Sequence, residues 1–328
     1  MKRKNKYLRT SARNGLLTLA VFVILGLFSN ETIVNVTSRV AIMSLYAISF
    51  NLMLGYTGMT SIGHALYFGF GGYALMICLT KFNMALPLAI LVSIVVVIPL
   101  AWFLGTAALK NNMLTFSFLT MGLCTTVQLI IYKTQAIGGT VGITYYFLPS
   151  WLTNFRVLYF FLLACVTVCI LILFLLTLSP YAHTLKGVRE NDERMTFLGL
   201  NVRLMRTSVY VISAVFADIA GILYAFRNSG VYTSALDGAV SNQAIMMCIV
   251  GGKSSFFGPI LGSGIITVLQ NWLSLKTIYF EGVIGIVIIL TAYWMRGGLL
   301  GPEGLVAKLK LDKIMNHFKK GGAESGAK

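Results

Sequence analysis

The chain has 328 residues, of which 57% are hydrophobic and only 11% are charged. Soluble domains carry about 25% charged residues, so this composition excludes an ordinary soluble protein and is typical of a membrane protein with many spans. The net charge of +16 would suit nucleic acid, but the basic residues gather beside apolar runs, as residues that orient membrane spans do. We therefore expect membrane lipid around the chain and no nucleic-acid partner.

Apolar runs between charges, glycines and prolines predict an all-α fold of about ten membrane helices, because about 20 apolar residues cross a bilayer core. The run 239–250 is too short to cross alone and is expected to extend into its neighbours. A count of eight stays open if short segments are re-entrant. In chain order, the predicted helices cover residues 14–29, 33–54, 64–80, 84–109, 113–133, 156–179, 207–227, 239–250, 258–275 and 279–295.

Basic residues near the ends of these helices predict the topology. Residues 1–13 form a basic N-terminus, residues 14–301 a single membrane domain, and residues 302–328 a basic C-terminal tail. With a cytoplasmic N-terminus and an even number of spans, the basic segment 180–206 and the C-terminal tail also lie in the cytoplasm, where positive residues are expected. The uncharged loop 134–155 then lies on the opposite side of the membrane.

Two glycine clusters interrupt the predicted helices, one in each half of the chain. Residues 55–72 read GYTGMTSIGHALYFGFGG, and glycines recur from 251 to 264. Such segments indicate a transport pathway, because non-helical backbone at membrane depth needs protein or cavity water as its partner. For the second cluster, close helix packing through small residues is an equally good interpretation. For the first, polar side chains favour a pathway, with candidates Tyr56, Thr57, Gly58, Ser61, Gly63 and His64.

The tripeptide Gly252-Lys253-Ser254 looks like the end of a phosphate-binding loop. That motif, G-x-x-x-x-G-K-[ST], needs a glycine five residues before Gly252, and the residue there is Met247. The motif should also follow a buried strand, whereas here it separates two predicted membrane helices. The match is a chance one, so we expect no ATP and no other cofactor to bind to this chain by itself.

The segment 180–206, PYAHTLKGVRENDERMTFLGLNVRLMR, is the one strongly polar stretch inside the membrane domain. Leu185, Val188, Met195 and Leu198 fall within one arc at helical spacing, and Gly199 followed by Asn201 gives a stop signal. These features predict a short amphipathic helix against the cytoplasmic face. A solvated loop and a helix lying on lipid are the alternatives, but docking to a cytoplasmic partner explains the mixed charge and apolar face better.

Ionisable residues are scarce inside the apolar runs. The histidines and cysteines lack metal-ligand spacing, and neither H-E-x-x-H nor G-x-S-x-G occurs, so a catalytic or metal site is not expected. An ion-coupled transporter would need paired intramembrane carboxylates, and the ionisable groups are only His64, Asp218, Arg39 and Glu281. Asp218 is interpreted either as functional or, preferably, as a structural residue that is buried against Ser213 or tyrosine hydroxyls or is protonated because of desolvation.

Five stretches, in the same order along residues 45–301, resemble the permease subunits of branched-chain amino-acid ABC importers. The most specific is GVRENDERMTFLGLNVRLMRTSVYVISAVFADIAGILYA, with its arginine-glutamate-asparagine run. NLMLGYTGMTSIGHALYFGFGGY, IVGGKSSFFGPILGS and the closing Arg296–Gly301 resemble the family's other glycine-rich elements. The chain departs from the family pattern at Asp218, where a small residue is usual, and at Lys253-Ser254-Ser255, which replaces a glycine-rich run.

The resemblance implies that segment 180–206 carries a coupling helix that docks on an ATPase. It implies a second homologous permease, two cytoplasmic ATPases that hold ATP and Mg²⁺, an extracytoplasmic binding protein, and a place in the bacterial cytoplasmic membrane. The loop 137–143 resembles the family's threonine-glycine-glycine loop and adds Gly139 and Thr140 to the pathway candidates. Related permeases carry branched-chain amino acids, urea, short amides or sugars. The implied coupling residues are Val188, Arg189, Glu190, Asn191, Asp192, Arg194, Leu198 and Gly199.

Overall fold

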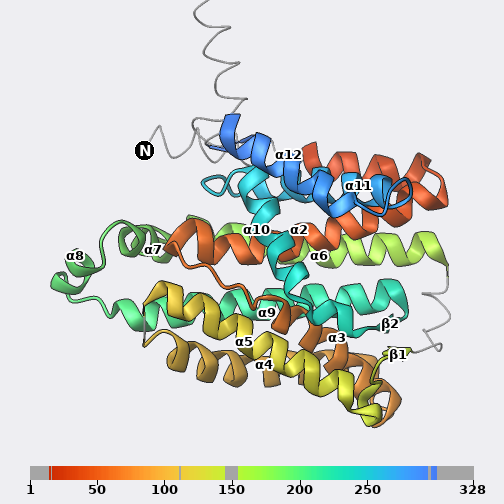
Figure 1. Ribbon diagram of the computed structural model, residues 1–328, viewed down its shortest axis with the longest axis horizontal. Coiled ribbons are helices and arrows are strands. Elements are labelled where there is room, and N and C mark those ends of the chain that lie inside the picture. The colour runs from red at the N-terminus through yellow and green to blue at the C-terminus, as the bar shows by residue number, and fades with distance from the viewer. Residues whose placement is uncertain (1–14, 16, 111, 145–153, 295–296, 301–328) are drawn as a thin grey trace, which may run out of the picture.

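The computed structural model (Figure 1) describes residues 15–300 apart from 16, 111, 145–153, 295 and 296. Helices dominate this part of the chain, which confirms the all-α class. After a first apolar helix at Leu17–Phe28, the long elements are α2 (Glu31–Thr57), α3 (Ala65–Thr80), α4 (Leu86–Ala108), α5 (Met113–Lys133), α6 (Phe155–Leu178), α9 (Val202–Asn228), α10 (Gly238–Gly251), α11 (Gly258–Ser274) and α12 (Phe280–Trp294). The short ones are η1 (Gln135–Ile137), β1 (Ile143–Thr144), α7 (Pro180–Glu190), α8 (Asp192–Phe197), β2 (Gly230–Val231) and η3 (Thr233–Leu236).

Each of the ten predicted helices has a counterpart among the observed ones, but not all of them have the length of a bilayer crossing. In the described part of the chain, five helices are long and apolar enough to cross: α2, α4, α5, α6 and α9. The predicted extension of 239–250 is wrong, since α10 has 14 residues. Its start is capped by Asp237, whose side chain accepts from the Ala239 amide, and its end is followed by Gly252 at φ 106°. The count of ten crossings stays a prediction.

The two ends of the molecule differ in structure (Figure 1). One end, which we call the α7 end, carries α7 and α8 beside the end of α2 and the start of α9. The other, which we call the hairpin end, carries the antiparallel pair of β1 and β2, in which Ile143 lies opposite Val231. The end of η3 packs inward from there, because Leu236 lies against Gly69 in α3.

The core forms around α2 and the neighbouring pair α3 and α9. Helix α2 contacts α6, α7, α9, α10 and α11, and 94% of its most apolar window is buried. Small residues let α3 and α9 approach closely, as expected between membrane helices. A Cβ atom on Gly221 would overlap the carbonyl of Phe68, and one on Gly71 would overlap the carbonyl of Asp218.

Between α2 and α3 the chain turns back into the bundle without forming a helix. Helix α2 ends at Gly58, whose φ of 75° is left-handed, and α3 begins at Ala65. His64 then lies beside Ser49, eight residues before the end of α2, which corresponds to about 12 Å along the helix axis. Residues 58–64 therefore form a re-entrant segment at membrane depth.

The end of α10 is held by the last described residues of the chain. The amides of Leu299 and Leu300 donate to the carbonyls of Val250 and Gly251, both at 3.0 Å. Four carbonyls at a helix end lack intrahelical partners, so these bonds satisfy two of them. They also fasten the chain after α12 to the last turn of α10.

The close contact of α3 and α9 predicts a large difference between two glycine substitutions. Gly221→Ala should lower the stability of the purified protein by about 1–3 kcal/mol, because the new methyl group must displace backbone. Gly122→Ala, in α5, is the control, since a Cβ atom there would have nothing within 4 Å. Thermal unfolding in detergent measures both variants. Equal melting temperatures would show that the α3–α9 contact relaxes freely.

Candidate functional site

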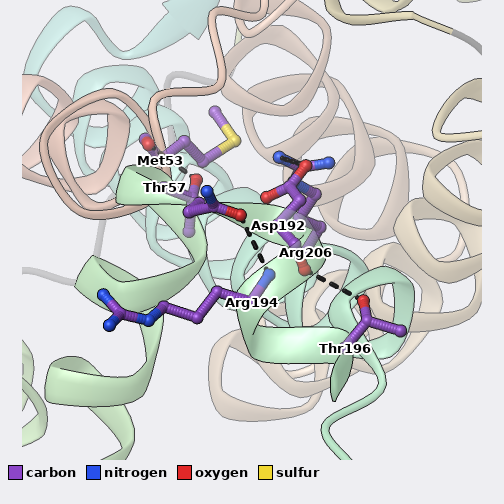
Figure 2. Close-up of polar contacts among 7 residues, drawn as sticks. Met53, Thr57, Asp192, Arg194, Thr196 and Arg206 are labelled. Atoms are coloured by element: carbon purple, nitrogen blue, oxygen red, sulfur yellow. Dashed lines mark hydrogen bonds and ion pairs between the residues drawn. The ribbon is translucent and has the colours of Figure 1, made fainter. Parts of the chain in front are cut away.

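The polar segment folds as two short helices rather than one. Helix α7 starts with Pro180, which suits the first helical position, and ends at Glu190. Asn191 is extended, with φ −159° and ψ 110°, and its side chain accepts from the Arg194 amide at 2.9 Å to start α8 (Figure 2). The prediction of a single helix is therefore wrong, because the Asn191 side chain caps a new helix instead of continuing the old one.

The break at Asn191 changes which apolar side chains of the segment are buried. Leu185 and Val188 are buried as predicted, and the Met195 side chain packs against Gly187. Leu198, predicted on the same face, is 70% exposed, and neighbouring Phe197 is 91% exposed. The turn at Asn191 redirects α8, so its apolar end projects away from the bundle.

Helix α7 is bonded to the C-terminal turn of α2. The Arg189 guanidinium donates to the Gly55 carbonyl at 2.6 Å, and the Lys186 ammonium lies 5.1 Å from the Tyr56 ring centroid. Cations are favourable at the C-terminal end of a helix, where carbonyls lack partners. The backbone of Lys253, in the loop after α10, approaches Gly55 from another side. Helix α7 and the loop after α10 thus both contact the last turn of α2.

Helix α8 is joined to α9 instead. The Asp192 carboxylate pairs with Arg206 at 2.6 Å, and the Arg203 guanidinium donates to the Thr106 carbonyl at the end of α4 at 2.8 Å. Beside these contacts is an open pocket of about 590 Å³. Its lining includes Asp192, Thr196, Gly199, Asn201 and Arg206.

The pathway candidates lie at three levels. Tyr56, Thr57 and Gly58 are at the α7 end, where a Cβ on Gly58 would come 3.4 Å from the Arg189 side chain. Ser61, Gly63 and His64 are buried inside the bundle. Gly139 and Thr140 belong to the loop before β1, at the hairpin end, so the structure does not bring them together with the other six.

His64 is the centre of the interior level. It is fully buried, its Nε2 lies 3.1 Å from the Ser49 hydroxyl, and its ring stacks on Tyr46 with centroids 5.2 Å apart. Tyr67 donates to Tyr210 at 2.9 Å nearby, which joins α3 to α9. The sequence did not predict the places of Ser49, Tyr46, Tyr67 and Tyr210, because single residues within long apolar runs give no sign of such a cluster.

Asp218 is buried in the middle of α9 and bonded to α4. The Ser93 hydroxyl donates to its carboxylate, with distances of 3.0 and 3.2 Å to the two oxygens. The predicted partner Ser213 is wrong, since that hydroxyl donates to the Ser49 carbonyl. In the described part of the chain, no group of three histidine, cysteine or acidic residues could hold a metal ion.

These features together define a multi-pass membrane transport subunit: bilayer-length helices, a re-entrant polar segment inside them and a charged helix pair at one end. The sequence profile of one family matches residues 32–292. The chain belongs to that family, the permease components of branched-chain amino acid transport systems. It is therefore a permease subunit of an ABC importer.

Individual relatives agree with this assignment. The high-affinity branched-chain amino acid transport system permease protein LivM of Salmonella typhimurium is 25% identical over 84% of this chain and 72% of its own length. LivM of Escherichia coli is 23% identical over the same shares. The xylose transport system permease protein XylH of Escherichia coli is 24% identical, over 38% of this chain and 33% of its own length. No solved structure matches the chain.

The Asp218–Ser93 contact predicts opposite effects of two substitutions. Ser93→Ala should lower stability by about 1–3 kcal/mol, because it leaves a buried carboxyl group without its donor. Asp218→Asn keeps an oxygen for Ser93 and removes a buried acidic group, so its melting temperature should equal or exceed that of the wild type. A stable Asp218→Asn protein that has lost transport would instead assign Asp218 to the pathway.

Proposed function

We propose that the chain carries a branched-chain or similar amino acid across the bacterial cytoplasmic membrane. It would work with a second homologous permease, two ATPases and an extracytoplasmic binding protein, with ATP and Mg²⁺ bound only on the ATPases. Family membership and the similarity to the LivM proteins support this substrate class. In this proposal the α7 end and both termini are cytoplasmic.

The observation that carries the proposal is the bond from Arg189 to the Gly55 carbonyl. It connects an exposed charged helix to α2, three residues before the re-entrant segment begins. A push on α7 by an ATPase would therefore act directly on residues 58–64 and on His64 at their end. A ligand must favour one of two conformations for energy to be transmitted in this way, and ATP bound to the partner would do so.

The surface of α7 and α8 suits a protein partner. Glu190, Glu193 and Arg194 are exposed, and so is the apolar pair Phe197 and Leu198 at the end of α8. Interfaces combine an apolar centre with a polar rim, and this arrangement is what an ATPase would contact. We propose that these residues bind the ATPase and that Arg189 transmits the movement of α7 to α2.

A second candidate is a related importer for uncharged solutes. It is favoured by two xylose permeases, which match 38% and 44% of the chain. The two LivM proteins match 84% of the chain, which favours amino acids.

Two substitutions separate docking from transmission. In proteoliposomes with the binding protein and ATPases, Arg189→Gln should leave the ATPases bound and active but lower amino-acid uptake about tenfold, because one charge-assisted bond is lost. Glu190→Arg should instead weaken co-purification of the ATPases through reversed charge at their interface.

Lys276→Glu, which reverses a charge after α11 at the hairpin end, is the matched control and should change neither quantity. Wild-type uptake in both α7 variants would remove α7 from the mechanism. Uptake by the purified chain without any ATPase would overturn the proposed function itself.

A further inference from the structure

Two arginines meet on α2 and α9 at the hairpin end. Arg227 is in the last turn of α9, and Arg39 is in the third turn of α2. The two guanidinium groups are close enough for their charges to repel. Among the described residues the one ion pair is Arg206 with Asp192, at the other end of the molecule, so neither arginine has a carboxylate partner in that part of the chain.

Arg227 is fixed by neutral acceptors. Its Nε donates to the Ser38 hydroxyl at 3.0 Å, one terminal nitrogen donates to the Asn228 side chain at 2.8 Å, and the other to the Asn35 side chain at 2.6 Å. It also reaches the Asn35 carbonyl at 3.1 Å. These bonds tie α9 to α2, so Arg227 serves mainly as a structural link that adds positive charge.

Arg39 has no such partners. Its Nε is buried and makes no hydrogen bond in the described structure, although the residue as a whole is partly exposed. Asn35 precedes it by four residues and lies on the same face of α2, which places Arg39 beside the Arg227 link. A buried donor without an acceptor is destabilising, so this group does not stabilise the fold unless a ligand supplies the acceptor.

The position of Arg39 on α2 indicates where such a ligand would bind. Tyr46 and Phe50 follow it by seven and eleven residues, which is the same face of a helix, and both rings pack against His64. Arg39 therefore lies on the face of α2 that leads to the His64 cluster, about 10 Å nearer the hairpin end. This face is buried at Tyr46 and Phe50, whereas Arg39 is partly exposed at its hairpin end, so a solute that enters the bundle from that end would meet Arg39 first.

We propose that Arg39, supported by the charge of Arg227, binds the carboxylate of the transported amino acid on the hairpin side of the His64 cluster. The inference rests on the proposed function and adds a requirement to it: the solute carries a negatively charged group. A guanidinium matches a carboxylate with two parallel hydrogen bonds. Urea and sugars offer no such group, so the site favours amino acids over the solutes of related permeases.

The test uses the complete importer in proteoliposomes, with radiolabelled L-leucine, L-isoleucine and L-valine as probes. Arg39→Gln should lower uptake of the transported amino acid about tenfold, the effect expected for one lost charge-assisted contact. Arg39→Lys keeps the charge and should recover part of the uptake. Arg156→Gln is the matched control, because it removes an exposed positive charge at the start of α6, also at the hairpin end.

Two further measurements test whether Arg39 binds a different negatively charged group, on the binding protein or on a lipid. Docking of the binding protein should be equal for wild type and Arg39→Gln; weaker docking would assign Arg39 to a carboxylate of that protein and overturn the proposal. Uptake by the wild type should be the same in phosphatidylcholine with or without phosphatidylglycerol; dependence on the anionic lipid would assign Arg39 to a headgroup.

The outcomes also distinguish a failure of the proposed function from a failure of the carboxylate site alone. If the wild-type importer carries none of the three amino acids, the proposed function fails, and the carboxylate site fails with it. If the wild type carries one of them and Arg39→Gln carries it equally well, the proposed function stands and only the site is overturned.

Discussion

The re-entrant segment 58–64 imposes the main constraint on this structure, because peptide groups without helical hydrogen bonds need partners inside a membrane protein. Its neighbours α5 and α10 supply them, at the segment itself and at the first residue of α3. Ser117 in α5 donates to the Thr60 carbonyl, Ser241 in α10 accepts from the Ala65 amide, and Gly63 lies against the backbone of Thr120. The short length of α10 follows from the same constraint, since its first turn must meet the start of α3 inside the bundle.

Helix α2 links the functional regions because it runs through the bundle without interruption from Glu31 to Thr57. One end receives Arg189 and the loop of Lys253, its middle holds His64 through Ser49, and its other end carries Arg39 beside Arg227. These contacts share one continuous helix, so under the proposed function a displacement at the α7 end would be transmitted along α2. A helix with a left-handed residue at Gly58 also ends sharply, which concentrates any movement in the segment that follows.

The sequence predicts the helices of this structure better than the contacts between them. Apolar runs predicted ten apolar helices whose bounds lie within five residues of the observed ones. They did not predict the length of α10, because the Asp237 cap and Gly252 determine where that helix begins and ends. The single helix over 185–198 was wrong, since its periodicity is real but Asn191 caps a second helix. Ser93 as the partner of Asp218, and the Tyr67–Tyr210 bond, depend on which faces of α3, α4 and α9 meet, and one sequence contains no such information.

The interior level around His64 is tightly packed in this structure, and it contains a polar atom without a partner. Tyr46, His64, Tyr67 and Tyr210 are all buried to within 1% exposure, and one hydrogen bond between tyrosines joins α3 to α9 at this level. The His64 Nδ1 has no hydrogen-bond partner in the described structure, which costs about 1–3 kcal/mol. A water molecule or a polar solute beside His64 would supply that partner. Under the proposed function, such a solute would offset part of the apolar contact that is lost when the helices separate.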